Sequence, residues 1–247
     1  MNNITYYILS ILAVLIILAV HEYAHGYVAY KLGDNTAKNL GRLTLNPIKH
    51  IDPVGTLCMI FFHVGWAKPV PVNPRNFNNP KKDFAKVALA GPISNIIMGF
   101  FSAFLYLLVF AIFKDKTFSE DDFSFKLLQN ALLFIFLFHT INVGLGVFNL
   151  LPIPPFDGSR ILNVILPEKT YFAVMRHERK IYFGVLIWLL CGDTVANAVR
   201  MLPIVQNSAL LYNAAGVFSL SGMLSTAIGF ISDLMMKFWQ LIPFLKV

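Results

Sequence analysis

Charged residues are scarce in this sequence. Of its 247 residues only 13% are Asp, Glu, Lys or Arg, whereas 57% are hydrophobic, and the mean hydropathy is +0.64. A typical soluble domain carries about a quarter charged residues, so this composition excludes a soluble globular domain as the starting class. We therefore expect a membrane protein.

Cysteine, basic N-terminal residues and flexible linkers are also in short supply. The only two cysteines, Cys58 and Cys191, lie in apolar surroundings and cannot build a disulfide framework. The leading MNNITYY has no basic residue, and the apolar run behind it is too long for the core of a cleaved signal peptide, so we expect an uncleaved membrane span. No repeat or low-complexity stretch divides the chain. Residues 1–247 are therefore expected to form a single intramembrane domain, with its polar motifs in 14–166 and C-terminal helices in 170–247.

Long apolar runs are present instead. A helix needs about 20 apolar residues to cross about 30 Å of hydrocarbon. Four strong runs cover residues 5–30, 84–113, 127–149 and 181–191 with its flanks. A fifth run, 209–236, is weaker because it contains Asn, Gly and Ser. We therefore expect an all-α polytopic membrane protein with about four to six transmembrane helices.

The segment 51–65, IDPVGTLCMIFFHVG, is apolar but too short and too rich in Gly and Pro to span the membrane. Non-helical backbone survives at membrane depth only when it is buried in protein or lines a wet cavity. We therefore expect a small β-like or extended hairpin, embedded in the membrane between the first two spans and close to a polar cavity.

The basic residues, which give a net charge of +7, are concentrated in alternate loops. Residues 31–86 hold nine Lys or Arg against three Asp or Glu, and residues 151–180 hold five against three. Residues 114–126 hold three against four. This alternation indicates membrane topology under the positive-inside rule rather than binding to nucleic acid. We expect a multi-pass protein of the cell (plasma) membrane, with its N-terminus outside and residues 31–83 in the cytosol.

Three ionisable residues, His21, Glu22 and His25, interrupt the first apolar run. Histidines four apart lie one turn above each other on a helix, so both imidazoles can reach one metal ion. Glu22 then lies where it can contact a water on that metal, as in the H-E-x-x-H motif. A chance match is the alternative, but ionisable groups are costly inside a membrane, which favours a function. Because His21 lies about 24 Å along the helix from residue 5, we expect the site toward the cytosolic side.

Imidazole and carboxylate ligands suit zinc, and hydrolysis needs no redox change, so we expect the metal to be zinc. A hydrolytic zinc site needs a third protein ligand and an open fourth position. The candidates are Asp157, His139, His63, His50 and Asp52. Asp157 is the strongest, because the prolines and glycine of NLLPIPPFDGSR break the helix near the inner end of a span. The alternatives are that Asp157 caps a helix over 158–166 and that His139 is a packed, hydrogen-bonded histidine.

Four blocks of sequence, HEYAHG, GWAKPVPVNP, AGPISN and FNLLPIPPFDGSR, together resemble the site-2 protease family of intramembrane zinc metalloproteases. The similarity covers most of residues 14–166 and is carried by the four blocks jointly. The chain is similar to the minimal bacterial type of the family, since it shows no inserted PDZ-like module. The segment after residue 170 carries no block of the family.

The resemblance implies a catalytic zinc site. His21, His25 and Asp157 would bind one Zn2+ per chain, and the metal would lower the pKa of a water molecule toward neutrality. Glu22 would be the catalytic base, taking a proton from the attacking water and later delivering it to the leaving amine.

Two asparagines also match positions of the family that face the active site. These are Asn95 in AGPISN and Asn149 before the proline run. The resemblance implies that either amide holds the substrate carbonyl or the oxyanion. The alternative for each asparagine is a hydrogen bond between membrane helices.

Residues 65–77, GWAKPVPVNPRNF, contain three prolines, which exclude a helix and favour an extended path. The resemblance implies a substrate-facing segment. Its substrate-binding residues would be Gly65, Trp66, Lys68, Pro69, Val70 and Pro71. A membrane helix must unwind before its peptide bonds can be attacked, and an extended segment can pair with the unwound chain by strand addition. The alternative is a rigid connector with Trp66 as a headgroup anchor.

These features predict an intramembrane zinc metalloprotease that cuts membrane-anchored proteins within or near their transmembrane segments, as in regulated intramembrane proteolysis. The alternative is a non-catalytic membrane zinc-binding protein, a carrier or a sensor, which would need no base at Glu22. A serine protease is suggested only by SLSG at 219–222, which lacks the expected preceding glycine. The expected partners are the lipid bilayer and the substrate. Without a PDZ-like gate, substrate selection could involve a homodimer or a regulatory membrane partner.

Overall fold

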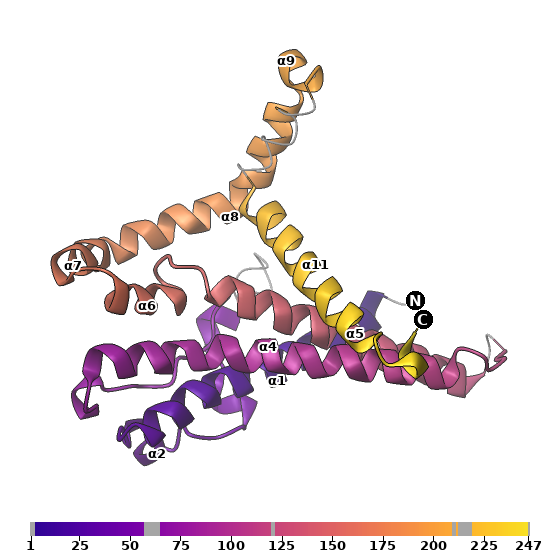
Figure 1. Ribbon diagram of the computed structural model, residues 1–247, viewed down its shortest axis with the longest axis horizontal. Helices are drawn as coiled ribbons and strands as arrows, with labels where there is room; N and C mark the ends of the chain where they lie inside the picture. Colours follow the sequence, from indigo (N-terminus) through magenta and orange to yellow (C-terminus); the bar gives the residue numbers. More distant parts are fainter. Residues whose placement is uncertain (1–2, 57–64, 120–121, 209–210, 212–218, 247) are drawn as a thin grey trace.

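The computed structural model describes residues 3–56, 65–119, 122–208, 211 and 219–246 (Figure 1). The regular elements in this part of the chain are all helical. Four helices are long and apolar enough to cross a membrane: α1 (Asn3–Lys31), α4 (Pro80–Phe113), α5 (Phe123–Asn149) and α8 (Glu178–Arg200). The expectation of a helical multi-pass membrane protein is confirmed.

Shorter elements connect and follow these helices. They are α2 (Thr36–Asn39), η1 (Pro47–His50), η2 (Pro74–Asn76), α6 (Gly158–Ile165), α7 (Glu168–Arg176), α9 (Pro203–Gln206), α11 (Leu220–Trp239) and η4 (Pro243–Leu245). Figure 1 shows α4 and α5 lying along the long axis with α1 against them. α6 and α7 lie at the end of the molecule that also carries α2. α11 starts beside Asp193 of α8, short of the C-terminal end of that helix, and runs to the α4–α5 pair.

Glycines bring α4 and α5 into close contact. A Cβ on Gly99 of α4 would lie 2.8 Å from Cγ2 of Val143 in α5. A Cβ on Gly146 of α5 would likewise lie 2.8 Å from Cδ1 of Ile96 in α4. The absence of a side chain at both positions permits the van der Waals packing that associates helices in a lipid environment. This contact fixes the depth at which residues of the two helices face each other.

The N-terminal half of α4 contains a break in its hydrogen bonding. The side chain of Asn79 caps the helix by accepting the N–H of Lys82, and Pro80 occupies the first turn. Pro92 lies inside the helix, and because proline has no N–H, the carbonyl of Ala88 loses its usual intrahelical donor. Ala88 lines the cavity described below, so this break occurs at the functional part of the helix.

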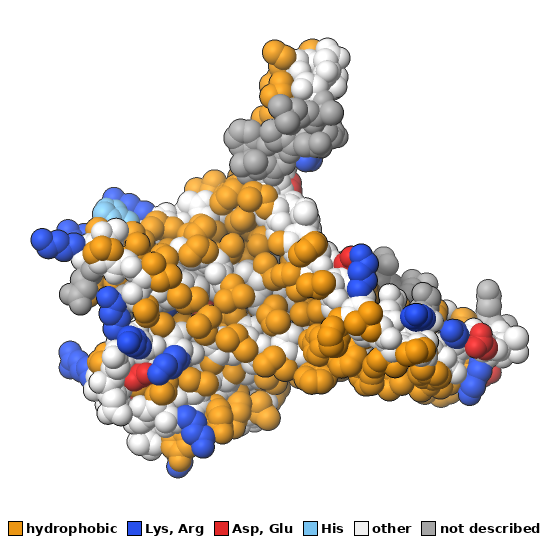
Figure 2. Space-filling model, viewed as in Figure 1, with side chains coloured by type: hydrophobic (Ala, Val, Ile, Leu, Met, Phe, Trp, Pro, Cys, Tyr) orange, Lys and Arg blue, Asp and Glu red, His pale blue; other side chains and the backbone are white. Residues whose placement is uncertain are grey.

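Basic side chains gather at one end of the molecule. Figure 2 shows Lys and Arg concentrated at the end that carries α2 and α7, whereas hydrophobic side chains cover the middle. The basic segments 31–86 and 151–180 both contribute to this end. Two basic segments at a common end are what the positive-inside rule requires of loops on one side of a membrane.

The predicted β-like hairpin is not present as strands among the described residues. Residues 53–56 are helical, and residues 65–73 follow a path without regular secondary structure. Most of the predicted hairpin over 51–65 falls on residues 57–64, which lie outside the described part of the chain. The irregular path of 65–73 agrees with its prolines, which cannot donate hydrogen bonds to a β-ladder.

The C-terminal region pairs α8 with α11. The apolar run 181–191 lies inside α8, and the weaker run 209–236 contains most of α11, although much of 209–218 is outside the described residues. Asp193 of α8 accepts hydrogen bonds from the hydroxyls of Ser219 and Ser221 at the start of α11, at 2.6 Å for Ser221. These polar contacts join the two helices. α11 is not among the four helices that meet the length and hydropathy of a membrane span.

Candidate active site

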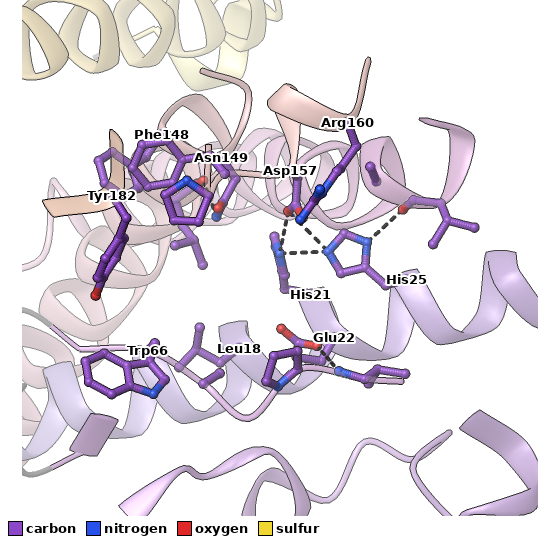
Figure 3. Close-up of a pocket in the computed structure, with 18 of the residues that line it drawn as sticks. Leu18, His21, Glu22, His25, Trp66, Phe148, Asn149, Asp157, Arg160 and Tyr182 are labelled. Carbon is purple, nitrogen blue, oxygen red and sulfur yellow. Dashed lines mark hydrogen bonds and ion pairs between the residues drawn. The ribbon is translucent and has the colours of Figure 1, made fainter. Parts of the chain in front are cut away.

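The two histidines of α1 converge, as their spacing predicts. Nε2 of His21 and Nε2 of His25 lie 3.0 Å apart, and both residues are buried. Oδ2 of Asp157 lies 3.1 Å from Nε2 of His21 and 3.2 Å from Nε2 of His25. Figure 3 shows the three side chains pointing toward one another. The structure thus brings the three predicted metal ligands together.

Asp157 reaches this point because the chain breaks after α5. A proline-rich stretch follows Asn149 and leads into α6, which begins at Gly158. A Cβ on Gly158 would collide with the carbonyl oxygen of Leu150, so glycine is required where the chain folds back on itself. Asp157 occupies the N-cap position of α6 but makes no capping hydrogen bond. Its carboxylate faces the histidines, and the alternative of a helix cap is therefore wrong.

The donor set at this point fits a zinc ion. Two imidazole nitrogens and a carboxylate oxygen, 3.0 to 3.2 Å apart, repel one another unless a proton or a cation lies among them. Nδ1 of His25 lies 2.7 Å from the carbonyl oxygen of Val87, which can only accept. In the neutral ring, Nδ1 therefore carries the proton and Nε2 keeps its lone pair for a metal. Imidazole with a carboxylate is a ligand set that suits zinc.

Gly91 of α4 keeps the space beside the two histidines open. A Cβ at this position would lie 2.6 Å from Nε2 of His21 and would also collide with Nε2 of His25. Any side chain here would therefore enter the space that a shared metal ion needs. This role of Gly91 was not predicted from the sequence. The one sequence signal for this role is that Gly91 lies four residues before Asn95 in AGPISN, on the same face of the helix.

The other candidate ligands lie elsewhere. His139 forms a hydrogen bond of 2.8 Å with the carbonyl of Gly99 across the α4–α5 contact, in agreement with its interpretation as a packed histidine. His50 and Asp52 bind backbone groups of their own loop. His63 lies outside the described residues. In the part of the chain that the structure describes, no second group of three potential metal ligands occurs.

Glu22 lies beside the three ligands but outside their group. Its Oε2 atom accepts a hydrogen bond of 2.7 Å from the backbone N–H of Val70. Glu22 lines the cavity, and Figure 3 shows its carboxylate between the histidines and the irregular segment 65–73. A carboxylate oriented by the protein next to a metal site can accept a proton from a water molecule there.

Hydrogen bonds hold segment 65–73 along the cavity. The N–H of Lys68 donates to the carbonyl of His50, and the carbonyl of Lys68 accepts from Nη2 of Arg42, both at 2.8 Å. The predicted substrate-binding residues that line the cavity are Gly65, Trp66, Pro69 and Val70. Lys68 and Pro71 do not line it. The backbone of Lys68 therefore anchors the segment instead.

A buried carboxylate anchors the far end of the same segment. Asp34, which is fully buried, accepts hydrogen bonds of 2.7 Å from the N–H of Asn73 and from Nδ2 of Asn76. It also accepts two hydrogen bonds from Thr36. Burial alone would raise the pKa of Asp34, but these hydrogen bonds outweigh burial and hold the pKa below its ordinary value. Asp34 thus ties the loop after α1 to the segment beside the cavity.

Removing this carboxylate is expected to loosen segment 65–73. Because the pKa of Asp34 is lowered in the folded protein, its stabilising effect is complete above the ordinary pKa of 3.8 and is lost as the pH falls through the lower folded value. Asp34→Asn keeps only one acceptor oxygen, so amide exchange at Asn73 should accelerate at least about tenfold at pH 7. Hydrogen exchange followed by mass spectrometry measures this rate.

Asp83→Asn is the matched control for this experiment. Asp83, at the start of α4, is likewise a buried carboxylate and forms an ion pair of 2.7 Å with Lys86. Its replacement should leave exchange at Asn73 unchanged. Equal exchange in Asp34→Asn and in the unaltered protein would contradict the anchoring role.

The two predicted asparagines lie in different surroundings. Asn149, at the end of α5, lines the cavity, and its Nδ2 donates to the carbonyl of Leu145 at 3.0 Å. Asn95 of α4 is fully buried and does not line the cavity. Nδ2 of Asn95 lies 3.1 Å from Nδ1 of His21. Only Asn149 therefore borders the space that a substrate could occupy.

A cavity of about 570 Å3 lies beside the ligands. Much of its wall is apolar or aromatic: Leu18, Phe84, Leu145, Phe148, Phe156, Tyr182, Val185, Leu186 and Leu189. Arg160 also lines the cavity and forms an ion pair of 3.0 Å with Glu178. Neither Arg160 nor the wall formed by α8 was predicted: Arg160 is the last residue of the block FNLLPIPPFDGSR but was given no role, and α8, which supplies part of the wall, carries no motif of the site. An apolar wall beside a polar reaction centre suits an apolar peptide segment.

The H-E-x-x-H motif lies on α1, a candidate membrane span, and Asp157 from the N-cap of α6 lies against its two histidines. This combination is typical of the intramembrane zinc metalloproteases and defines the class of this protein. The sequence profile of Peptidase family M50 matches residues 9–192, and the chain belongs to this family. The matched region includes all four sequence blocks and every residue of the candidate site. The predicted membership of the site-2 protease family is confirmed.

Named relatives agree with this classification. YwhC of Bacillus subtilis, provisionally named a zinc metalloprotease, is 39% identical over 211 residues, which are 83% of this chain and 92% of the relative. Rip2 of Mycolicibacterium smegmatis, also provisionally named a zinc metalloprotease, is 28% identical over 74% of this chain and 67% of the relative. Zinc metalloprotease MJ0392 of Methanocaldococcus jannaschii is 26% identical over 68% of this chain and 38% of the relative. No solved structure matches the chain. The protein is thus an intramembrane zinc metalloprotease, as the sequence predicted.

Proposed function

We propose that His21, His25 and Asp157 bind a single Zn2+ ion and that Glu22 is the catalytic base. The observation that carries this proposal is the convergence of two Nε2 atoms and Oδ2 of Asp157 within 3.2 Å, with Glu22 adjacent but outside the group. Zinc bound there supplies Lewis acidity and lowers the pKa of a water molecule toward neutrality. A carrier or sensor would not need the oriented carboxylate of Glu22.

The side chains around the site have separate tasks in this reaction. Glu22, held by the N–H of Val70, takes a proton from the attacking water and then delivers it to the nitrogen of the leaving amine. Asn149 borders the cavity, where its amide can donate to the carbonyl oxygen of the peptide bond under attack. The apolar wall excludes bulk water from the bond, which strengthens these electrostatic interactions.

The substrate that fits this cavity is a transmembrane segment of a membrane-anchored protein, cut in regulated intramembrane proteolysis. Apolar side chains of such a segment match the wall formed by α5 and α8. After local unwinding, its backbone can pair with residues 65–71, which lie in a non-helical path beside Glu22. Trp66 is 43% exposed and can at the same time anchor the segment at the headgroup level.

The proposed orientation has the N-terminus outside the cell and the active site toward the cytosol. The basic segments 31–86 and 151–180 contribute to one end of the molecule. Each segment also contains a residue of the site, Val70 in the first and Asp157 in the second. Segments with such an excess of Lys and Arg stay on the cytosolic side of a plasma membrane. Protease accessibility of tags at the two ends of α1 would measure this orientation directly.

Removal of zinc is the experiment that tests the proposed function. Purified protein in lipid nanodiscs is treated with a chelator and incubated with a membrane peptide that contains one transmembrane segment. Cleavage should fall to background, because zinc supplies the Lewis acid of the reaction. One equivalent of zinc per chain should restore it. Cleavage that persists in metal-free protein would contradict the proposal.

A further inference from the structure

Asn95 lies behind a metal ligand rather than in the cavity. Its side chain is fully buried on α4, and its amide lies 3.1 Å from Nδ1 of His21. The other ring nitrogen of His21, Nε2, faces His25 and Asp157. Oδ1 of Asn95 is buried and has no hydrogen-bond partner among the described residues. Such an unpaired buried acceptor is costly and calls for a partner.

The chemistry of the imidazole ring supplies this partner. A ring that binds a metal through Nε2 carries its proton on Nδ1, so Nδ1 of His21 must be a donor. The amide next to it then has to accept, which only Oδ1 can do. Because the oxygen and the NH2 group of an amide have the same shape, a half-turn of the amide brings Oδ1 to the position 3.1 Å from Nδ1. This rotation pairs the Nδ1–H of His21 with Oδ1, the only atom of the amide that can accept it.

We infer that Asn95 is a positioning residue, which accepts the Nδ1–H of His21 through Oδ1 and so holds the ring in its metal-binding tautomer and orientation. The inference rests on the proposed zinc site. Groups that accept from the outer nitrogen of a ligating histidine fix the ring and increase its basicity. Asn95 would therefore act through His21 without touching the substrate.

The spacing of three residues along α4 supports this role. The carbonyl of Val87 accepts from Nδ1 of His25 at 2.7 Å, Gly91 leaves space for the metal, and Asn95 faces Nδ1 of His21. These positions are four residues apart and lie on one face of the helix. One face of α4 thus orients both histidines of α1 and keeps the metal position clear between them.

This inference separates Asn95 from Asn149, although the sequence suggested the same tasks for both. An amide that stabilises an oxyanion must donate into the cavity where the charge develops. Asn149 lines the cavity, whereas Asn95 does not. The two roles make opposite demands on the amide: positioning of His21 uses the acceptor oxygen, and oxyanion binding uses the donor nitrogen.

Asn95→Asp and Asn95→Leu distinguish these roles. Aspartate keeps the acceptor and removes the donor, whereas leucine removes both at similar volume. Asn95→Leu should weaken zinc binding by about 10- to 100-fold, and Asn95→Asp should bind zinc at least as tightly as the unaltered protein and retain its cleavage activity. Zinc affinity is measured by competition with a chelator in protein that elutes as a single species. Asn142→Leu, which removes another fully buried amide from the neighbouring α5, should leave zinc affinity unchanged.

Other results would overturn the inference. Loss of cleavage in Asn95→Asp with zinc still bound would assign the donor role to Asn95, and tight zinc binding in Asn95→Leu would exclude positioning. If Asn95→Asp does not fold, the zinc affinities of Asn95→Ala and Asn142→Leu are compared instead. Weaker binding in Asn95→Ala alone supports positioning, and equal affinity in the two variants contradicts it. His21→Ala tests the underlying site separately, because zinc that remains in this variant would reject the proposed ligands whatever the Asn95 variants do.

Discussion

Glu22→Gln is expected to reduce peptide cleavage by about 100- to 10,000-fold, the range for loss of a general base, while zinc remains bound. Glutamine has nearly the same shape and can still accept from the N–H of Val70 through its amide oxygen, so the cavity should keep its form. It cannot take a proton from water at neutral pH. Cleavage of a membrane peptide in nanodiscs and zinc content per chain measure the two effects independently.

Asp233→Asn makes a comparable change far from the cavity. Asp233 is an exposed residue of α11 that pairs with Lys237 at 2.7 Å, so its replacement should leave cleavage unchanged. A Glu22→Gln protein that still cuts at an undiminished rate would reject Glu22 as the base. Loss of zinc together with activity would instead indicate that Glu22 helps to hold the metal. In cells, membrane peptides that differ between intact and Glu22→Gln protein would identify the physiological substrates.

Gly91→Ala should strongly weaken both zinc binding and cleavage, although it adds only a methyl group. The added Cβ would lie 2.6 Å from Nε2 of His21 and would press on Nε2 of His25, in the space that the metal ion must share with both. Neither neighbour is the flexible end of a long side chain, because both rings are buried and held by hydrogen bonds of α4. We expect zinc affinity to fall by more than about 100-fold, beyond the effect of removing a group behind a ligand.

Gly229→Ala is the control for Gly91→Ala. A Cβ at Gly229 of α11 would meet no atom within 4 Å, so the same substitution in a helix should be tolerated there. Metal analysis and circular dichroism after detergent extraction distinguish a lost site from an unfolded protein. A folded Gly91→Ala protein that binds one zinc per chain with unaltered affinity would show that the metal does not lie where the histidines converge.

The membrane spans and the histidine pair were predictable because both depend on local properties. Run length and hydropathy decide whether a helix can cross a bilayer, and the four candidate spans follow the four strong apolar runs. His21 and His25 occupy one helix, so their approach needs only the pitch of that helix. Asp157 could be preferred among five candidates because prolines surround it. Its approach to the histidines also depends on Gly158, where a side chain would collide with the carbonyl oxygen of Leu150.

Other features could not be predicted because they depend on packing between distant segments. The wall that α8 contributes to the cavity carries no motif, and its apolar residues serve a membrane span equally well. The β-like hairpin over 51–65 was predicted from an apolar composition that contains Gly and Pro. Such a composition disfavours a helix but does not select one non-helical path among several. Lys68 was grouped with substrate-binding residues, yet its backbone is held by His50 and Arg42.

The sequence by itself determined the class of this protein, a membrane-spanning zinc metalloprotease, and predicted His21 and His25 as metal ligands and Glu22 as the base. These conclusions follow from residue type and from spacings within one helix. Only the tertiary structure decided that Asp157 lies against both histidines, that Val87 and Asn95 face the outer nitrogens of the two rings, and that Gly91 leaves room between them. The hydrogen bonds to the two histidines join residues 62, 74 and 136 positions apart, and such contacts depend on how whole helices pack rather than on any local pattern.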